Sequence, residues 1–436
     1  MNLQHGCWGQ PAGASSTPLS TRHRNAMTTP APIQAPPRAL PAGTARTLYL
    51  GYYAFILLGV NASAIGPALP AFAERTGASL AQVGLLFTPF ALGYATSVLI
   101  MGPISARSGT RALLLAGATC LVISLTLLTL GRSLMLIYLG AYLLGLGQSG
   151  TQVGYNALVG LLAGDKAART LNRLNAFFGI GALSGPLLVA LGYSVLGDGS
   201  LAFGASLFMS VPLWVAAWRR HEQQPAEKRL LSDETGKMTF SDVLRQPVLW
   251  VLGITASIYV SAEVTFSGWA AAYAERSAGV GPAESALMVT VFFAAFTAGR
   301  YAADAVARFV SPSVIVTAAI GVSALGVLKM IAGAQVFAIN LIGAATVGFA
   351  FGPIYPIFLS YGIRLFPRHA TLATGFLTSA AAVATLVVPS AVGVLMAEQG
   401  ARAGWWAVLG LIVALLGAWL TLSRRLARQL PVQQRK

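Results

Sequence analysis

Long apolar segments separated by short polar ones recur from about residue 46 to about residue 425. Each contains 18 or more residues with few charges, enough for a helix to cross roughly 30 Å of hydrocarbon. The pattern therefore predicts twelve membrane-spanning helices. The predicted spans are approximately 46–72, 80–104, 111–130, 133–162, 171–197, 199–218, 248–274, 284–307, 311–331, 335–363, 370–397 and 403–423.

Two features divide these spans into two groups of six. The segment 219–247 is the longest hydrophilic stretch between spans, and its mixed charges predict a cytoplasmic linker. The halves also resemble each other at an offset of about 200 residues, with GLGQSG at 145–150 against GFAFGP at 348–353. Such repetition predicts an all-α membrane protein of two pseudo-symmetric six-helix bundles with a binding site between them.

The predicted organisation has five parts. The bundles occupy residues 45–218 and 248–424, on either side of the linker. Residues 1–44 are rich in Pro, Ala, Ser and Thr and predict a disordered cytoplasmic tail, whether translation starts at Met1 or Met27. Residues 425–436 form a second cytoplasmic tail.

Composition and charge support a membrane protein rather than a soluble one. The chain is 56% hydrophobic and 10% charged, with a mean hydropathy of +0.68, too few polar side chains to cover a soluble fold. Its net charge of +16 is spread over short loops, which disfavours a nucleic-acid partner.

The basic residues predict the orientation in the bilayer. If the N-terminus is cytoplasmic, the loops on the far side carry few basic residues, and 24 of the 29 lie inside. The outer ones are Arg75, Arg132, Arg276, Lys329 and Arg402. We therefore expect a multi-pass, monomeric protein of the cell membrane with both termini cytoplasmic, and the Ala, Gly and Arg usage favours a bacterial inner membrane.

The sequence contains no pattern typical of an enzyme or a metal centre. Cys7 lies in the tail and Cys120 in a predicted span, so no paired-cysteine site is expected, and no ATP-binding P-loop pattern occurs. We expect no enzymatic activity, no cofactor and no metal. A solute gradient or a coupled ion would have to drive any transport.

Three amides form a stripe on the fourth predicted span. Gln148, Gln152 and Asn156 are spaced four residues apart and so share one helical face. An unsatisfied amide in hydrocarbon costs several kcal/mol, so these side chains must face protein or water. Two interpretations remain open: polar contacts between helices, worth about 0.6 kcal/mol each, or a site for a neutral polyol.

One acid is predicted near membrane mid-depth. Glu263 lies about fifteen residues into the seventh span, and an intramembrane carboxylate is a functional candidate by default. It could bind solute hydroxyls or carry a transported proton. The alternative is a structural partner for Arg300 on the eighth span, although Arg300 also has the spacing for a local ion pair with Asp304.

Further polar and aromatic residues lie near this region. Asn175 could contact solute or cap its helix, and Trp269 and Tyr355 have aromatic faces that suit a pyranose ring, although packing is the common alternative. Gly352, Pro353 and Pro356 predict a broken helix within the tenth span, while GxxxG at Gly181 and Gly185 predicts close helix packing. Gly185 is followed by Pro186, and this pair resembles a Gly-Pro element on span five of drug and proton antiporters, so efflux stays open as an alternative.

The loop GPISARSGTR, residues 102–111, is similar to the signature between spans two and three of the major facilitator superfamily. Gly102, Arg107, Gly109 and Arg111 match it, and Ala106 replaces its acid. The resemblance implies a gating role for this loop and a transporter fold of two six-helix bundles.

Five further segments resemble the fucose-permease branch of sugar transporters. They are LPAFAERTGASLAQVGLL at 69–86, GLG with downstream Asn156, LNRLNAFFGIGALSGPLL at 171–188, YVSAEVTFSGW at 259–269 and GFAFGPIYPIFLS at 348–360. The branch implies sugar import, often with protons, through carboxylates that fall here on Gly66 and Gln152. Because both are neutral, the resemblance does not carry proton coupling to the N-terminal half.

Together these observations predict a secondary or facilitative transporter of a small neutral polar solute, with or without a co-transported proton. A monosaccharide is the expected solute, bound by Gln148, Gln152, Asn156, Asn175, Glu263, Trp269 and Tyr355. Two alternatives remain: an efflux antiporter for drugs or metabolites, and a membrane sensor or scaffold that transports nothing.

Overall fold

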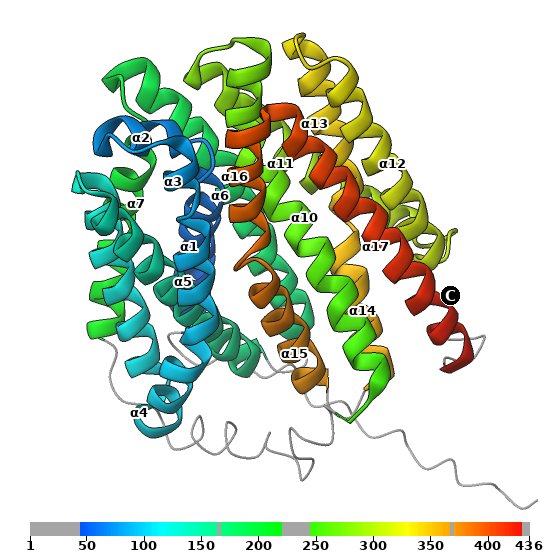
Figure 1. Ribbon diagram of the computed structural model, residues 1–436. Coiled ribbons are helices and arrows are strands. Elements are labelled where there is room, and N and C mark those ends of the chain that lie inside the picture. Colours follow the sequence, from blue (N-terminus) through cyan, green and yellow to red (C-terminus); the bar gives the residue numbers. More distant parts are fainter. Residues whose placement is uncertain (1–43, 164–166, 220–244, 367–369, 430–436) are drawn as a thin grey trace, which may run out of the picture. The chain divides into compact units, whose positions relative to one another are not determined.

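The computed structural model describes residues 44–163, 167–219, 245–366 and 370–429, and these residues fold into helices (Figure 1). The helices of the first half are α1 (Thr44–Ala64), α2 (Leu69–Thr76), α3 (Leu80–Gly84), α4 (Phe87–Leu130), α5 (Leu134–Ala163), α6 (Ala167–Leu196) and α7 (Leu201–Trp218). Those of the second half are α10 (Pro247–Ala278), α11 (Pro282–Val306), α12 (Pro312–Ala332), α13 (Phe337–Phe351), α14 (Ile354–Leu365), α15 (Ala370–Ala384), α16 (Val388–Gln399) and α17 (Ala401–Gln429).

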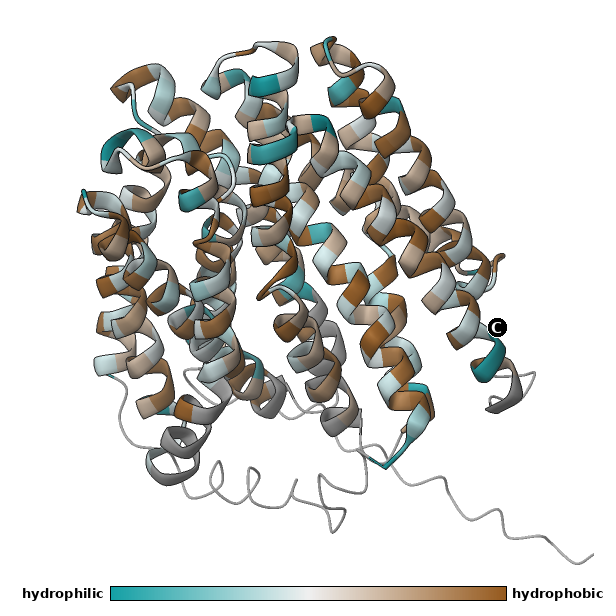
Figure 2. Ribbon diagram, in the orientation of Figure 1, coloured by the Kyte–Doolittle hydropathy of each residue, from teal (hydrophilic) through white to brown (hydrophobic). Residues whose placement is uncertain are grey.

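Within these described residues, eleven helical stretches are long and apolar enough to cross a membrane. They correspond to all the predicted spans except 80–104, which falls on α3 and the first part of α4 and includes residues whose side chains are not described. Hydrophobic residues run along the helices, and hydrophilic ones gather near helix ends (Figure 2). The all-α membrane fold is therefore confirmed.

The predicted tails and linker lie largely outside the described residues, which omit 1–43, 220–244 and 430–436. Helix α17 continues to Gln429, past residue 424, where the second bundle is predicted to end and the C-terminal tail to begin.

Glycines allow the helices of each half to touch backbone to backbone. A Cβ on Gly145 of α5 would overlap the carbonyl oxygen of Phe90 in α4, and a Cβ on Gly348 of α13 would overlap that of Phe292 in α11. Such close approach lets dispersion forces hold helices together in lipid, where hydrophobic burial gives little net gain. The two contacts are equivalent in the two halves, about 200 residues apart.

A pair of tryptophans repeats the same symmetry. Trp214 of α7 donates its indole N–H to Thr119 Oγ1 of α4 at 3.0 Å, and Trp419 of α17 donates to Thr317 Oγ1 of α12 at 2.9 Å. Each bond ties the last helix of its half to an earlier one. The predicted pseudo-symmetry is thus visible in side-chain contacts.

The predicted GxxxG packing on α6 is also confirmed. A Cβ on Gly181 would overlap the Ile56 carbonyl of α1, and one on Gly185 would overlap Ser63 and Val60. Helix α6 is thereby held against α1 over more than one turn.

The helix break predicted in the tenth span separates α13 from α14. Pro356 has no N–H to offer the Gly352 carbonyl four residues earlier, so that oxygen is free for another donor. Arg300 of α11 supplies one, with its Nε 3.2 Å from the Gly352 oxygen. Tyr259 of α10 donates its hydroxyl to the neighbouring Phe351 carbonyl at 2.8 Å. Two side chains therefore stabilise a broken backbone that lipid could not satisfy.

Replacing Gly348 with alanine should destabilise the protein even though alanine favours helix by roughly 1 kcal/mol. The added methyl forces α13 away from Phe292 of α11. The matched control is Gly410→Ala in α17, where a Cβ meets no atom within 4 Å. In detergent, thermal unfolding of Gly348→Ala should occur several degrees below wild type, whereas Gly410→Ala should match or exceed it. Equal unfolding temperatures would contradict this packing.

Candidate functional site

The first part of the site joins α4 and α5. The Tyr94 hydroxyl donates to Gln152 Oε1 at 2.6 Å. The pair is positioned by the glycine contacts beside it, because Gly145 lies against the backbone at Phe90 and Tyr94. Gln152 is half-buried, so its amide nitrogen can still reach a ligand.

The second part lies on α10, α14 and α15. The rings of Tyr259 and Tyr355 stack with their centroids 6.4 Å apart and their planes at 15°. The Tyr355 hydroxyl lies 3.3 Å from Thr378 Oγ1. The break before Ile354 leaves Tyr355 in the first turn of α14, next to Tyr259.

Glu263 lies one turn beyond Tyr259 on α10 and is half-buried. It is within hydrogen-bonding range of the Tyr259 hydroxyl and close to the charge of Arg300. The Tyr259 hydroxyl also lies 2.8 Å from the Phe351 carbonyl oxygen, so it is shared between the broken backbone and Glu263.

Arg300 has different partners from the one predicted. Its Nε donates to Gly352, and its guanidinium lies 4.4 Å from the centre of the Phe296 ring. Within the described residues, the expected ion pair with Asp304 is not among its contacts, and Asp304 is exposed. Arg300 bonds to the Gly352 carbonyl instead of Asp304 because that carbonyl is buried and needs a donor within the protein, whereas Asp304 is exposed.

The two parts come from the two halves of the chain. Tyr94 of the first part is near enough to Tyr355 of the second for their hydroxyls to interact electrostatically, and Tyr355 likewise interacts with Glu263. We call the whole group the central polar cluster, and its members are Tyr94, Gln152, Tyr259, Glu263, Arg300, Tyr355 and Thr378. Four of them, Tyr94, Tyr259, Arg300 and Thr378, were not among the predicted binding residues. The sequence feature that could have identified Tyr259 as a member was its position one helical turn before Glu263.

Two of the other predicted amides lie on α5, one turn to either side of Gln152, and the third lies on α6. Gln148 is 4% exposed, and its side-chain oxygen has no hydrogen-bond partner among the described residues. Asn156 is half-buried one turn beyond Gln152. Asn175 is exposed and donates to the Leu171 carbonyl of its own helix at 3.0 Å. Their roles in binding remain predictions.

Trp269 lies away from the cluster, about 9 Å further along α10 than Glu263. Its ring is 1% exposed, and its Nε1 donates to the Pro389 carbonyl at 2.8 Å. A Cβ on Gly84 of α3 or on Gly393 of α16 would overlap the ring. In this conformation Trp269 therefore offers no face to a solute and instead joins the two halves.

Two more contacts close the same end of the molecule, which we call the Trp269 end. Thr88 of α4 donates to the Leu386 carbonyl at 2.7 Å and lies 2.8 Å from Ser390 Oγ. The backbones of Gly66 and Gly268 approach so closely that a Cβ on Gly66 would overlap the Gly268 oxygen. Helices α2, α3 and α16 lie at this end (Figure 1).

The predicted gating loop forms a kink within α4 rather than a separate loop. Gly109 has φ 77° and ψ 179°, a conformation that side chains disfavour. Arg111 donates to the Trp218 carbonyl of α7 at 2.8 Å. The side chains of residues 101–107, which include Arg107, are not described, so a gating role stays a prediction.

Comparison of the sequence with known proteins finds a family model and relatives that are transporters. A family model described as the Major Facilitator Superfamily matches residues 52–371. An uncharacterised MFS-type transporter of Yersinia pestis is 23% identical over 346 residues, 78% of this chain and 86% of the relative. The mouse sodium-dependent glucose transporter 1A is 24% identical over 302 residues, 61% of this chain and 70% of the relative.

Two solved structures share the fold. A bacterial homologue of the human lysosomal transporter Spinster, in an inward-facing and unoccupied conformation, has a TM-score of 0.69 at 16% identity, covering 90% of this chain and 99% of that one. The nucleoside transporter NupG has a TM-score of 0.71 at 11% identity, covering 86% and 99%. These identities show the fold alone.

A bulky residue at Gly393 should open the Trp269 end, because the indole has no room to move aside while Pro389 holds it. We expect Gly393→Leu to speed the labelling of Ser390→Cys by a membrane-impermeant maleimide by at least fivefold, in a background lacking Cys7 and Cys120. Ser390 is 5% exposed in the closed contact. Gly410→Leu is the control and should leave the rate unchanged. Equal labelling in all three proteins would show that Trp269 does not hold this end shut.

Proposed function

The chain belongs to the major facilitator superfamily, and we propose that it transports a small neutral polar solute of the monosaccharide class. The family and the structural neighbours are transporters, not enzymes. The observation that carries the proposal is the central polar cluster, which draws Tyr94 and Gln152 from one half and Glu263 and Tyr355 from the other. A solute bound there would contact both halves at once.

The chemistry of the cluster suits a polyol better than an ion. Gln152 and the tyrosine hydroxyls can both donate and accept hydrogen bonds, as sugar hydroxyls require. Glu263 and Arg300 carry opposite charges, so the cluster offers little net charge to select an anion or cation. Tyr355 is half-buried and backed by the fully buried ring of Tyr259, so its exposed part can offer an apolar surface to the C–H face of a sugar. The sodium-dependent glucose transporters of mouse and human among the relatives support the same solute class.

Alternating access follows from the two halves and the Trp269 end. We place this end on the outside of a bacterial inner membrane, since it neighbours the loops with few basic residues, and both termini in the cytoplasm. The described conformation would then be closed outward. Transport would require Trp269, Thr88 and Gly66 to separate from their partners while the opposite end closes.

Glu263 is the proposed site of proton coupling. Its ionised form can accept a hydrogen bond from Tyr259 and has Arg300 nearby, and its protonated form can instead donate to the Tyr259 oxygen. A change in the distance between α10 and α11 during transport would favour one form over the other. This supports, but does not require, a proton carried with the solute.

Loss of a cluster hydrogen bond should reduce transport without reducing insertion. We expect Tyr94→Phe, Gln152→Leu and Glu263→Gln each to lower the initial uptake of labelled monosaccharides by about tenfold, since leaving a buried partner unsatisfied costs roughly 1–3 kcal/mol. Proteoliposomes with a panel of sugars would measure this. Gln399→Leu, an exposed amide at the end of α16, should stay within twofold of wild type. Uptake unchanged in all three cluster variants would refute the site.

A pH gradient tests the coupling separately. If Glu263 must bind a proton on the outside, wild-type uptake should fall as external pH rises, because fewer carriers load. Glu263→Gln, which mimics the protonated acid, should lose this dependence. Uptake driven by a sodium gradient at constant pH is measured for comparison, to distinguish sodium coupling from proton coupling. Equal uptake at every pH and without sodium would indicate facilitated diffusion instead.

A further inference from the structure

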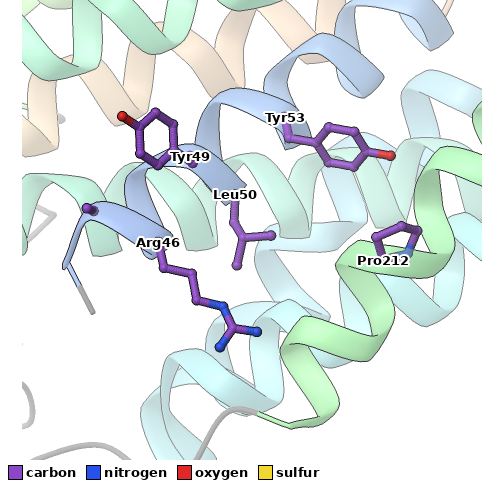
Figure 3. A pocket seen from close by; sticks show the side chains of 6 residues that line it. Arg46, Tyr49, Leu50, Tyr53 and Pro212 are labelled. Atoms are coloured by element: carbon purple, nitrogen blue, oxygen red, sulfur yellow. The ribbon is translucent and has the colours of Figure 1, made fainter. Parts of the chain in front are cut away.

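A surface cleft lies between the first turns of α1 and the part of α7 that contains Pro212 (Figure 3). Its volume is about 720 Å³, and it is lined by Ala45, Arg46, Tyr49, Leu50, Tyr53 and Pro212. None of these residues belongs to the central polar cluster or the Trp269 end. The cleft is therefore a feature that the transport site does not explain.

A proline and a tyrosine lie at the side of the cleft that faces α7. Pro212, inside α7, lines the cleft and has no N–H to donate to the Phe208 carbonyl one turn earlier. Tyr53 donates to the adjacent Met209 carbonyl at 2.9 Å, which ties α7 to α1 just beyond the cleft. Figure 3 shows the Tyr53 ring lying toward Pro212, with Arg46 and Leu50 along the same helix.

Aromatic residues indicate the depth of the cleft in the bilayer. Tyr49 is 71% exposed and Trp218, the last residue of α7, is 56% exposed. Such residues concentrate where hydrocarbon meets the headgroups. The mouth at Arg46 is thus at headgroup depth, and the seven residues to Tyr53 carry the cleft about 10 Å toward the hydrocarbon.

The charge of the lining indicates which chemical group the mouth of the cleft can bind. The lining has one cation, Arg46, and no carboxylate. Arg219 caps the C-terminus of α7, and Arg111 donates to the Trp218 carbonyl beside it, so two more guanidinium groups lie at the same end. Guanidinium groups bind phosphate oxygens in pairs, and each basic residue near an anionic leaflet contributes about 1 kcal/mol.

We propose that this cleft binds an anionic phospholipid, with its phosphate on Arg46 and the upper part of an acyl chain along Leu50, Tyr53 and Pro212. The lipid would occupy the cleft between α1 and α7. Both helices belong to the first half of the chain, so binding would stabilise that half without contacting the central polar cluster.

Native mass spectrometry of the purified protein tests this with phosphatidylglycerol and phosphatidylcholine of equal acyl chains. Wild type should retain phosphatidylglycerol preferentially, and Arg46→Gln should bind it about fivefold more weakly, the equivalent of one basic residue. Ala45→Phe, which fills the cleft but keeps Arg46, should weaken binding similarly. The matched control is Arg132→Gln, an exposed arginine at the other end of the molecule, which should behave as wild type.

Any of four outcomes would overturn the proposal. Arg46→Gln could retain phosphatidylglycerol as wild type does, or phosphatidylcholine could be retained equally. Alternatively, glycerol phosphate alone could raise the unfolding temperature as much as the lipid does, which would indicate an anion site without a chain. Unchanged binding by Ala45→Phe would likewise remove the acyl chain from the cleft.

Discussion

Hydrocarbon offers no hydrogen bonds, so every backbone group that leaves a regular helix must find its partner within the protein. This constraint organises the structure, because four of the predicted spans are broken in the described residues: between α1 and α2, between α3 and α4, between α13 and α14, and between α15 and α16. The Phe351 and Gly352 carbonyls take hydrogens from Tyr259 and Arg300. The Leu386 and Pro389 carbonyls take them from Thr88 and Trp269. Breaks that would be costly alone become attachment points for other helices.

The same bonds connect stability with function. Tyr259, Glu263 and Trp269 all lie on α10, so one rigid helix links the central polar cluster to the Trp269 end. A movement that released Trp269 from Pro389 would also shift Tyr259 and Glu263 relative to Arg300. Solute occupancy and closure can thus be coupled through a single helix, without a separate signalling path.

The sequence was sufficient for features set by local rules and insufficient for those set by tertiary contact. Span lengths, the Gly352–Pro356 break and the Gly181–Gly185 packing follow from hydropathy and from the covalent properties of glycine and proline. The partner of Arg300 could not be predicted, because local spacing favours Asp304 and the competing carbonyl comes from another helix. Trp269 was chosen for its chemistry, but its position depends on how α10 meets α3 and α16. Tyr94 was missed because nothing in its local sequence indicates its partner, Gln152, which comes from another helix.

The neutral residues of the first half have a physical explanation in these contacts. At Gly66 even a methyl group would overlap the Gly268 oxygen, so the closed Trp269 end excludes the carboxylate that the resemblance to sugar transporters implies at this position. At Gln152 an amide oxygen accepts the Tyr94 hydrogen, and the amide nitrogen remains as a donor that a carboxylate would lack. Gly66, between α1 and α2, therefore permits a close backbone contact between the halves, and Gln152 of α5 keeps both a donor and an acceptor. The carboxylate of the central polar cluster, Glu263, lies on the opposite half near Arg300, where its charge can be balanced.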